Sequence, residues 1–261
     1  AYALYLQAKS IYEKRENTDD TEIAQKLLQK AIELDENLIT AKLILGSSYK
    51  DMGDYDEAME IYTAALKKAE KLDDMLWIGR STRNLGHIYS AKGDYDTALD
   101  YYEKALTIAE EIGDKSGIGA CLNSSGGIYA INRDYDKALD YYERALTIAE
   151  ESGDKRKVYF SLDGIGFLYS RKGEYDTALD YYERALSIKE EIGVKSGIGW
   201  SLNSIGWVHY TKGDLDKALD YYERALTIAE KLGNKRGIAQ TLHSIGGLHR
   251  NKDDLDKALD C

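Results

Sequence analysis

Residues 94–112 have the sequence DYDTALDYYEKALTIAEEI, and the segment ALDYYE within it returns every 40 residues along the chain. Copies of this segment begin at Ala98, Ala138, Ala178 and Ala218, and the register extends back to Ala58 and forward to Ala258. A glycine keeps the same period at Gly46, Gly86, Gly126, Gly166, Gly206 and Gly246. Such self-similarity predicts a stack of repeated supersecondary units that share one continuous core.

Each repeat is expected to contain two helices. In the second helix, Ala98, Tyr102 and Ala105 follow the four- and three-residue spacing of one helical face. Asp94 can cap the start of this helix, and Gly113 can end it in the left-handed conformation. The recurring glycine and alanine positions let the two helices of a hairpin approach closely, while the neighbouring tyrosines fill the space beside them.

The repeat motif is a Gly-x-x-Tyr in the first helix, a Gly-Asp-Tyr-Asp turn, and Ala-x-x-x-Tyr-x-x-Ala in the second helix. This motif resembles the tetratricopeptide (TPR) repeat, and the 40-residue period is similar to the long repeats of the LGN/Pins polarity adaptors. The resemblance implies an all-α fold, a right-handed superhelical α-solenoid of about seven helix-turn-helix hairpins in one domain. The expected hairpins are an N-terminal hairpin at 1–37, repeats at 38–73, 74–113, 114–153, 154–193 and 194–233, and a truncated repeat at 234–261.

The last repeat is expected to stop within its second helix. Leu255, Ala258 and Leu259 start the apolar face of that helix, and the sequence ends at Cys261. Solenoids normally finish with a polar capping helix. We therefore expect either that the natural chain continues or that this end packs head to tail against another molecule.

Composition argues against several classes of partner and site. The net charge is −11, which disfavours nucleic acid and anionic membrane surfaces, because both attract clustered lysine and arginine. No apolar run approaches the roughly 20 residues needed to cross a bilayer. Two cysteines, Cys121 and Cys261, form neither a disulfide framework nor a CxxC motif, so a reducing cytoplasmic location is expected.

Catalytic motifs are missing from the sequence. It contains no HExxH, no P-loop and no GxSxG. His209 and His249 stand where the other repeats carry a tyrosine, which indicates a packing role rather than a metal-ligand role. The carboxylates recur with the repeat, whereas a catalytic pair should occur once. We therefore expect no enzymatic activity, no cofactor and no metal.

The aromatic residues suggest where a partner binds. The first helices of the hairpins line a concave groove if the chain follows the TPR pattern. The chain has 22 tyrosines but only 2 phenylalanines and 3 tryptophans, and both phenylalanines and two tryptophans fall in adjacent groove segments. Phe160, Phe167, Trp200 and Trp207, with Tyr210 beside them, are predicted to hold an apolar anchor of the partner. The alternative is that these aromatic side chains pack against one another and fill a tight superhelical turn.

Polar residues complete the predicted groove. In long TPR repeats an asparagine at this position clamps the backbone of an extended peptide, and the resemblance places Asn123 and Asn203 there. Asn84 lies one residue later in its own repeat and is included among the predicted groove residues. Asp163 and His243 occupy the matching position in two other hairpins. The remaining predicted groove residues are the cations Arg80, Arg83, Arg171 and Arg250. They favour an acidic segment or a terminal carboxylate as the partner's contact.

The expected function is a protein–protein interaction scaffold that binds a partner peptide or helix in its groove, as part of a larger signalling protein. Two alternatives stay open at this point. One is a regulatory domain that senses a short peptide, and the other is a structural array that assembles from copies of itself.

Overall fold

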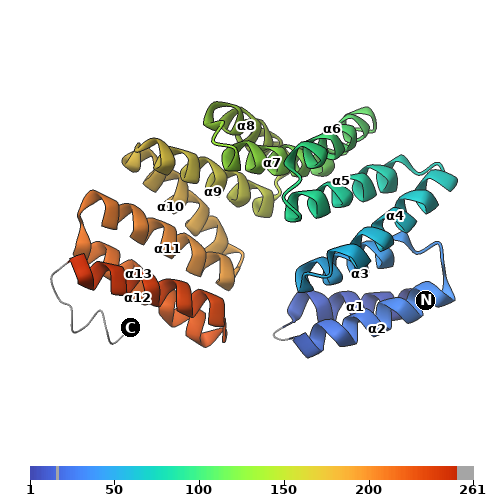
Figure 1. Cartoon of the computed structure of the whole chain (residues 1–261), viewed down its shortest axis with the longest axis horizontal. Helices are drawn as coiled ribbons and strands as arrows, with labels where there is room; N and C mark the ends of the chain where they lie inside the picture. The colour runs from blue at the N-terminus through green and yellow to red at the C-terminus, as the bar shows by residue number, and fades with distance from the viewer. Residues whose placement is uncertain (16–17, 252–261) are drawn as a thin grey trace. The chain divides into compact units, whose positions relative to one another are not determined.

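The chain folds into helices throughout the residues described by a computed structural model, 1–15 and 18–251 (Figure 1). The all-α prediction is confirmed, because these residues form helices and no strand. The residues Leu255, Ala258, Leu259 and Cys261, on which the expectation of an open last repeat rests, lie outside the described residues. The helices are α1 (Tyr2–Lys14), α2 (Thr18–Leu34), α3 (Ile39–Met52), α4 (Tyr55–Lys71), α5 (Met75–Ala91), α6 (Tyr95–Glu111), α7 (Lys115–Ile131), α8 (Tyr135–Ser152), α9 (Lys155–Lys172), α10 (Tyr175–Glu191), α11 (Lys195–Lys212), α12 (Leu215–Lys231) and α13 (Lys235–Asn251).

The helices are grouped in two compact units, Ala1–Ile128 and the part that begins at Tyr129. In the first unit each helix packs on the next from α1 to α6, and in the second unit the same holds from α8 to α13. The third hairpin is α5–α6, the fifth is α9–α10 and the sixth is α11–α12. This serial packing of hairpins confirms the solenoid architecture within each unit.

Helix ends follow the sequence signals. The Asp94 carboxylate accepts a hydrogen bond from the Thr97 backbone N–H at 3.2 Å, and Asp134 accepts one from Lys137 in the next repeat at 3.3 Å. Each bond satisfies a donor that the first turn of a helix leaves free. Gly113 has a φ of +69°, a conformation that glycine adopts without the penalty a Cβ brings. The predicted caps at Asp94 and Gly113 are confirmed.

Close contact between a glycine and a tyrosine holds together the four hairpins α3–α4, α5–α6, α9–α10 and α11–α12. A Cβ placed on Gly206 would lie 2.9 Å from the ring of Tyr222, whose side chain is 2% exposed. Gly86 has the same relation to Tyr102 in the third hairpin. The repeated glycine is therefore the position at which the tyrosine ring of the second helix lies on the backbone of the first.

Gly206→Ala is expected to lower the free energy of unfolding by about 1–2 kcal/mol, because the added methyl group overlaps the Tyr222 ring in a closely packed core. Gly199→Ala on the same helix provides the matched control. Its Cβ would lie 3.6 Å from the nearest atom of Ile228, and the gain in helix propensity is expected to stabilise the chain by up to about 1 kcal/mol. Urea unfolding followed by circular dichroism compares the two variants. Equal stability of the two would contradict the packing assigned to Gly206.

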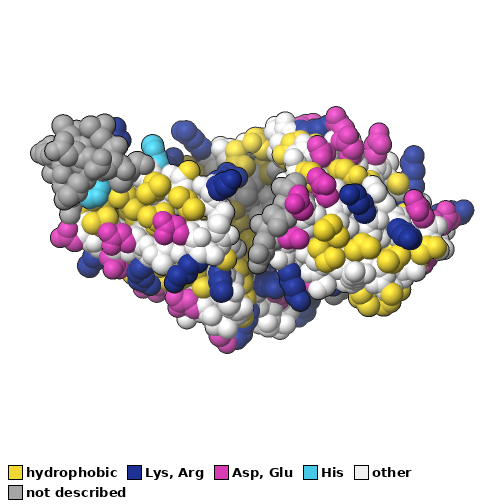
Figure 2. All heavy atoms as spheres, turned by 90° about the horizontal axis from the view of Figure 1, so that it is seen from below, with side chains coloured by type: hydrophobic (Ala, Val, Ile, Leu, Met, Phe, Trp, Pro, Cys, Tyr) yellow, Lys and Arg dark blue, Asp and Glu magenta, His cyan; other side chains and the backbone are white. Residues whose placement is uncertain are grey.

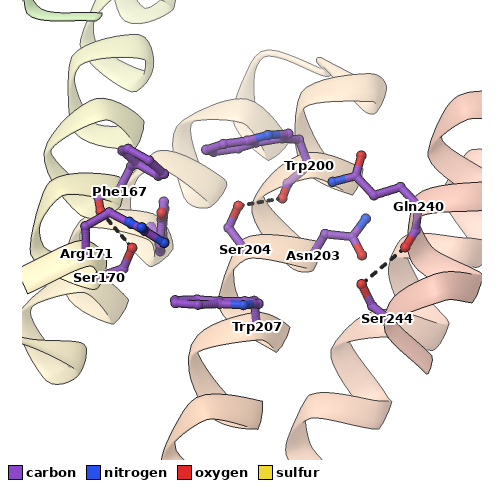
Figure 3. A pocket seen from close by; sticks show the side chains of 10 residues that line it. Phe167, Ser170, Arg171, Trp200, Asn203, Ser204, Trp207, Gln240 and Ser244 are labelled. Atoms are coloured by element: carbon purple, nitrogen blue, oxygen red, sulfur yellow. Dashed lines mark hydrogen bonds between the residues drawn. The ribbon is translucent and has the colours of Figure 1, made fainter. Parts of the chain in front are cut away.

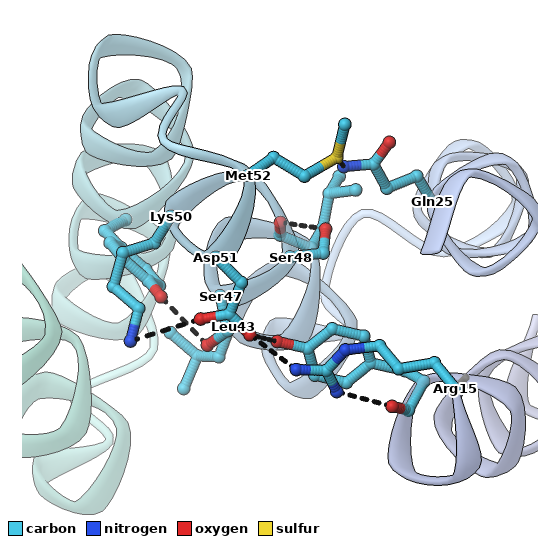
Figure 4. A network of polar contacts seen from close by, with 11 residues as sticks. Arg15, Gln25, Leu43, Ser47, Ser48, Lys50, Asp51 and Met52 are labelled. Atoms are coloured by element: carbon cyan, nitrogen blue, oxygen red, sulfur yellow. Dashed lines mark hydrogen bonds and ion pairs between the residues drawn. The ribbon is translucent and has the colours of Figure 1, made fainter. Parts of the chain in front are cut away.

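A polar network ties the first hairpin to the next (Figure 4). The Asp51 carboxylate of α3 accepts hydrogen bonds from the Tyr12 hydroxyl at 2.6 Å and from Arg15 at 2.7 Å, both at the end of α1. Lys50 lies 3.6 Å from the same carboxylate. Burial raises the pKa of Tyr12, and its hydrogen bond to Asp51 raises it further. The Tyr12 hydroxyl therefore stays protonated and continues to donate to Asp51.

Charged side chains of both signs are interspersed over the face shown in Figure 2. Three lysine–aspartate pairs recur in the register of the repeat: Lys92 with Asp56, Lys172 with Asp136 and Lys212 with Asp176. The three aspartates are 85–91% exposed, so each pair contributes little to stability. None of the described helices is both long enough and apolar enough to cross a membrane.

Candidate partner-binding site

A pocket of about 300 Å³ opens among helices α9, α10, α11 and α13 of the second unit. Trp200 and Trp207 point from α11 toward Phe167 and Arg171 of α9 (Figure 3). The two tryptophans are seven residues apart, or about two helical turns, so both lie on the same face of α11. The pocket is lined by Phe167, Ser170, Arg171, Tyr182, Trp200, Asn203, Ser204, Trp207, Gln240 and Ser244.

The aromatic walls of the pocket are open to solvent. Phe167, Trp200 and Trp207 are 40%, 42% and 39% exposed. Trp200 meets the buried ring of Tyr182 edge-on, with 5.9 Å between centroids, and this contact fixes one edge of the indole. Large aromatic surfaces that stay partly exposed around a concavity are typical of recognition sites rather than of a core.

Phe160, the fourth aromatic residue of the predicted hot spot, lies outside this pocket. Its ring stacks on Tyr159 of the same helix at 4.7 Å and is 58% exposed. Tyr210 also lies outside the lining, and it packs instead against a hydrophobic cluster that contains Tyr222 and Leu248. The structure therefore brings together three of the five predicted aromatic residues.

Arg171 and Asn203 are the predicted polar residues that the structure places in the pocket. The Asn203 amide donates a hydrogen bond to the Thr241 hydroxyl at 2.9 Å and is thereby held toward α13. His243 and Arg250 are exposed on α13, and neither lines the pocket. A peptide clamp by Asn203 stays a prediction. It requires the Asn203 amide to break its hydrogen bond to Thr241 and to form one with the peptide backbone instead.

The other predicted polar residues lie in the first unit. Arg80 covers the ring of Trp77 at 5.0 Å and pairs with Asp114 at 3.7 Å. Arg83 has a buried Nε without a hydrogen-bond partner among the described residues. Asn84 and Asn123 are half-buried.

The pocket has a positive character in an acidic protein. None of the described residues that line it is an aspartate or glutamate, although the chain has 46 of them. Arg171 is exposed at the pocket wall and forms no ion pair with any described residue. Its guanidinium is therefore available to a carboxylate of another molecule.

A buried ion pair lies behind Trp200, and sequence reasoning missed its role. Lys189 of α10 is 1% exposed, and its Nζ lies 2.6 Å from Asp163 Oδ2 of α9 and 2.6 Å from the Ser201 hydroxyl of α11. The same Nζ lies 5.0 Å from the ring centroids of Tyr159 and Trp200. The sequence signal was present, since Lys189 replaces the alanine that the other repeats carry at Ala69, Ala109, Ala149 and Ala229.

Burial dominates the electrostatics of this pair. It raises the pKa of Asp163 to about 6 against the opposing effect of Lys189, and it lowers the pKa of Lys189 against the opposing effect of Asp163. Both shifts oppose the charged form, so desolvation exceeds the mutual attraction. The pair thus holds three helices and the Trp200 indole in place at a cost in stability.

Histidines and acidic residues form no metal site within the described ranges, where no group of three or more potential ligands is found. His209 stacks on Tyr221 with an interplanar angle of 10°, the same angle with which Tyr169 stacks on Tyr181 one repeat earlier. The prediction that His209 substitutes for a packing tyrosine is confirmed.

Known sequence families match most of the chain. Residues 37–111, 118–191, 160–231 and 197–261 match the tetratricopeptide repeat, and residues 1–36 match the Sel1 repeat. None of the curated proteins compared with the chain matches it.

Several solved structures are similar in fold. BtubC (BKLC) from P. vanneervenii aligns over 83% of this chain and 91% of its own, with 23% identity and a TM-score of 0.66. The STAND protein with a tetratricopeptide repeat sensor, PH0952 from Pyrococcus horikoshii, aligns over 99% of this chain and 40% of its own, with 22% identity and a TM-score of 0.72. A Rap protein complexed with competence and sporulation factor aligns over 96% of this chain and 86% of its own, with 15% identity and a TM-score of 0.69.

Proposed function

We propose that this chain, which belongs to the tetratricopeptide repeat family, binds a peptide segment of a partner protein in the pocket among α9, α10, α11 and α13. The observation that carries the proposal is the combination of Trp200, Trp207 and Phe167 with the exposed Arg171 around one opening. The repeats build the scaffold from tyrosine, and these residues depart from the repeat where they line the pocket.

The lining defines the chemistry of the partner segment. An apolar side chain between the indoles would remove their exposed faces from water, which is the main source of affinity at aromatic hot spots. A carboxylate beside it would pair with Arg171 in the planar, two-pronged geometry that guanidinium groups favour. The partner is therefore an acidic segment with an apolar anchor.

A signalling role within a larger protein is part of this proposal. Two proteins of similar fold support it: one is described as complexed with a competence and sporulation factor, and the other as a STAND protein that carries its repeats as a sensor.

Trp207→Ala tests the proposal. Peptides selected against the purified protein from a random dodecapeptide phage library serve as the probe, and fluorescence anisotropy measures their affinity. Removal of this indole is expected to weaken binding about 30-fold, because a hot-spot truncation costs ~2 kcal/mol. Circular dichroism checks that the variant keeps its helical content, because the indole is 39% exposed and the rest of its surface packs against the protein.

Phe160→Ala provides the matched control, because this exposed ring lies on α9 outside the pocket. It should bind the same peptides as the unmodified chain does. Equal affinities of the Trp207→Ala variant and the unmodified chain would overturn the proposed site.

A further inference from the structure

A second cavity of about 160 Å³ adjoins the pocket on the side of the loop between α12 and α13. Trp200, Asn203 and Gln240 line both cavities, so one partner segment can cross from one to the other over these three side chains. The floor of the second cavity is apolar and contains Ala229 and Ile228 of α12. We call this cavity the α12 crevice.

The fifth hairpin shows the corresponding place filled. Tyr159 stands where the sixth hairpin has Gly199, and it packs in a cluster with Ala185 and its neighbours. Lys189 stands where the sixth hairpin has Ala229, and its chain reaches to 3.2 Å from a Cβ built on Gly197. Two large side chains thus occupy the volume that is empty in the sixth hairpin.

The third hairpin shows the corresponding place nearly closed. Its cavity measures only about 10 Å³, although it keeps the glycine at Gly79. A Cβ on Gly79 would lie 3.1 Å from Ile108, whereas one on Gly199 would lie 3.6 Å from Ile228. Arg80, at the position of Trp200, closes over the site by pairing with Asp114. Among these three hairpins, the open crevice is therefore confined to the one that carries the exposed tryptophans.

Charge and size indicate what enters the crevice. A volume of 160 Å³ suits one leucine or phenylalanine side chain, since a cavity of about 150 Å³ holds a benzene ring. Arg236 lines the crevice and, like Arg171 in the pocket, is exposed and forms no ion pair with any described residue. No described aspartate or glutamate lines either cavity. This arrangement complements a segment that is acidic and carries two apolar side chains.

We propose that the α12 crevice is a second recognition pocket, which receives a second apolar side chain of the acidic peptide segment whose first anchor lies between Trp200 and Trp207. The inference rests on the proposed function and adds to it a fixed spacing between two apolar residues of the partner. Specificity would then come from that spacing and from the two arginines that flank it.

The test uses peptides selected from the random dodecapeptide library, together with versions in which one apolar residue at a time is replaced by alanine. Gly199→Tyr gives the sixth hairpin the residue that fills the crevice in the fifth. This variant is expected to bind the parent peptide at least tenfold more weakly than the unmodified chain does. Its affinity for the peptide that already lacks the second apolar residue should be unchanged. Gly199→Ala, which leaves the crevice open, should bind the parent peptide within about twofold of the unmodified chain.

Ala229→Leu fills the crevice from the side of α12. It replaces Gly199→Tyr in the test if that variant changes the circular dichroism spectrum and so disturbs the helices. Full affinity of both filled variants would overturn the inference, and so would selected peptides with one apolar residue or with no constant spacing. In either case the loss caused by Trp207→Ala would leave the proposed function standing. A selection that enriches no peptide would overturn both.

Discussion

Replacement of Asp163 by alanine is expected to lower the free energy of unfolding by about 3–5 kcal/mol. The Lys189 ammonium is 1% exposed, and Asp163 Oδ2 at 2.6 Å is the one anionic atom that pairs with it among the described residues. The variant leaves a cation enclosed by Tyr159, Trp200 and the Ser201 hydroxyl. A buried charge without its partner costs more than the pair contributed, which is why the loss is large.

The double variant Asp163→Asn with Lys189→Ala is expected to recover this loss and to be at least as stable as the unmodified chain. It restores the asparagine and alanine that other repeats carry at these positions, as in Asn203 and Ala229. The direction follows from the pKa shifts, because burial opposes both charges more strongly than their attraction favours them. Urea unfolding of Asp163→Asn, Lys189→Ala and the double variant measures the coupling. A loss below 1 kcal/mol for Asp163→Ala would contradict the burial assigned to the pair.

The fold was predictable because the same sequence pattern recurs along the chain. The glycine, alanine and tyrosine positions recur four to six times, so chance patterns are averaged out, and each position has one physical role in packing two helices. Gly206 under the Tyr222 ring and Gly113 at a helix end illustrate this. Even a departure such as His209 was interpretable, because stacking on Tyr221 needs only a planar ring of similar size.

The site was predictable only in part. Phe167, Trp200 and Trp207 depart from the tyrosine pattern on first helices, and the structure places them around one pocket. Phe160 departs from it in the same way, but its ring lies on Tyr159, one residue before it, and stays outside the lining. This stacking depends on which of the two adjacent aromatic rings enters the hairpin core, and the sequence does not show which ring does so.

Lys189 and the crevice could not be found from the groove-facing positions. Both depend on second helices, whose residues the repeat pattern assigns to the scaffold. Their effect appears only when three helices are assembled: Lys189 of α10 reaches Asp163 of α9 and Ser201 of α11, and Ala229 of α12 leaves space beneath Trp200. An alignment of the repeats shows that these positions change, but the structure shows what the change does.

Acid is expected to destabilise the third hairpin specifically, through His87. The His87 Nδ1 lies 2.7 Å from the Tyr102 hydroxyl, and their rings meet edge-on. Burial, with smaller contributions from the charges of Arg83 and Lys50, lowers the pKa of His87 to about 3. In the unfolded chain the same imidazole takes up a proton near pH 6.5. Below pH 6.5 the unfolded state therefore binds a proton that the folded state does not bind until about pH 3, and stability falls as the pH falls through that interval.

His87→Ser isolates this effect, because the first repeat already has a serine at the matching position. Ser47 lies 2.9 Å from the Tyr62 hydroxyl there, so a serine preserves the contact with the tyrosine and removes the titrating group. Between pH 7 and pH 4 the unmodified chain is expected to lose about 2–3 kcal/mol relative to the variant. Hydrogen exchange of α5 and α6 measures the local loss, and that of α11 and α12 should not follow it. A constant difference between the two chains over this range would show that His87 protonates as readily in the folded state as in the unfolded state, and would remove the assigned cause of the acid sensitivity.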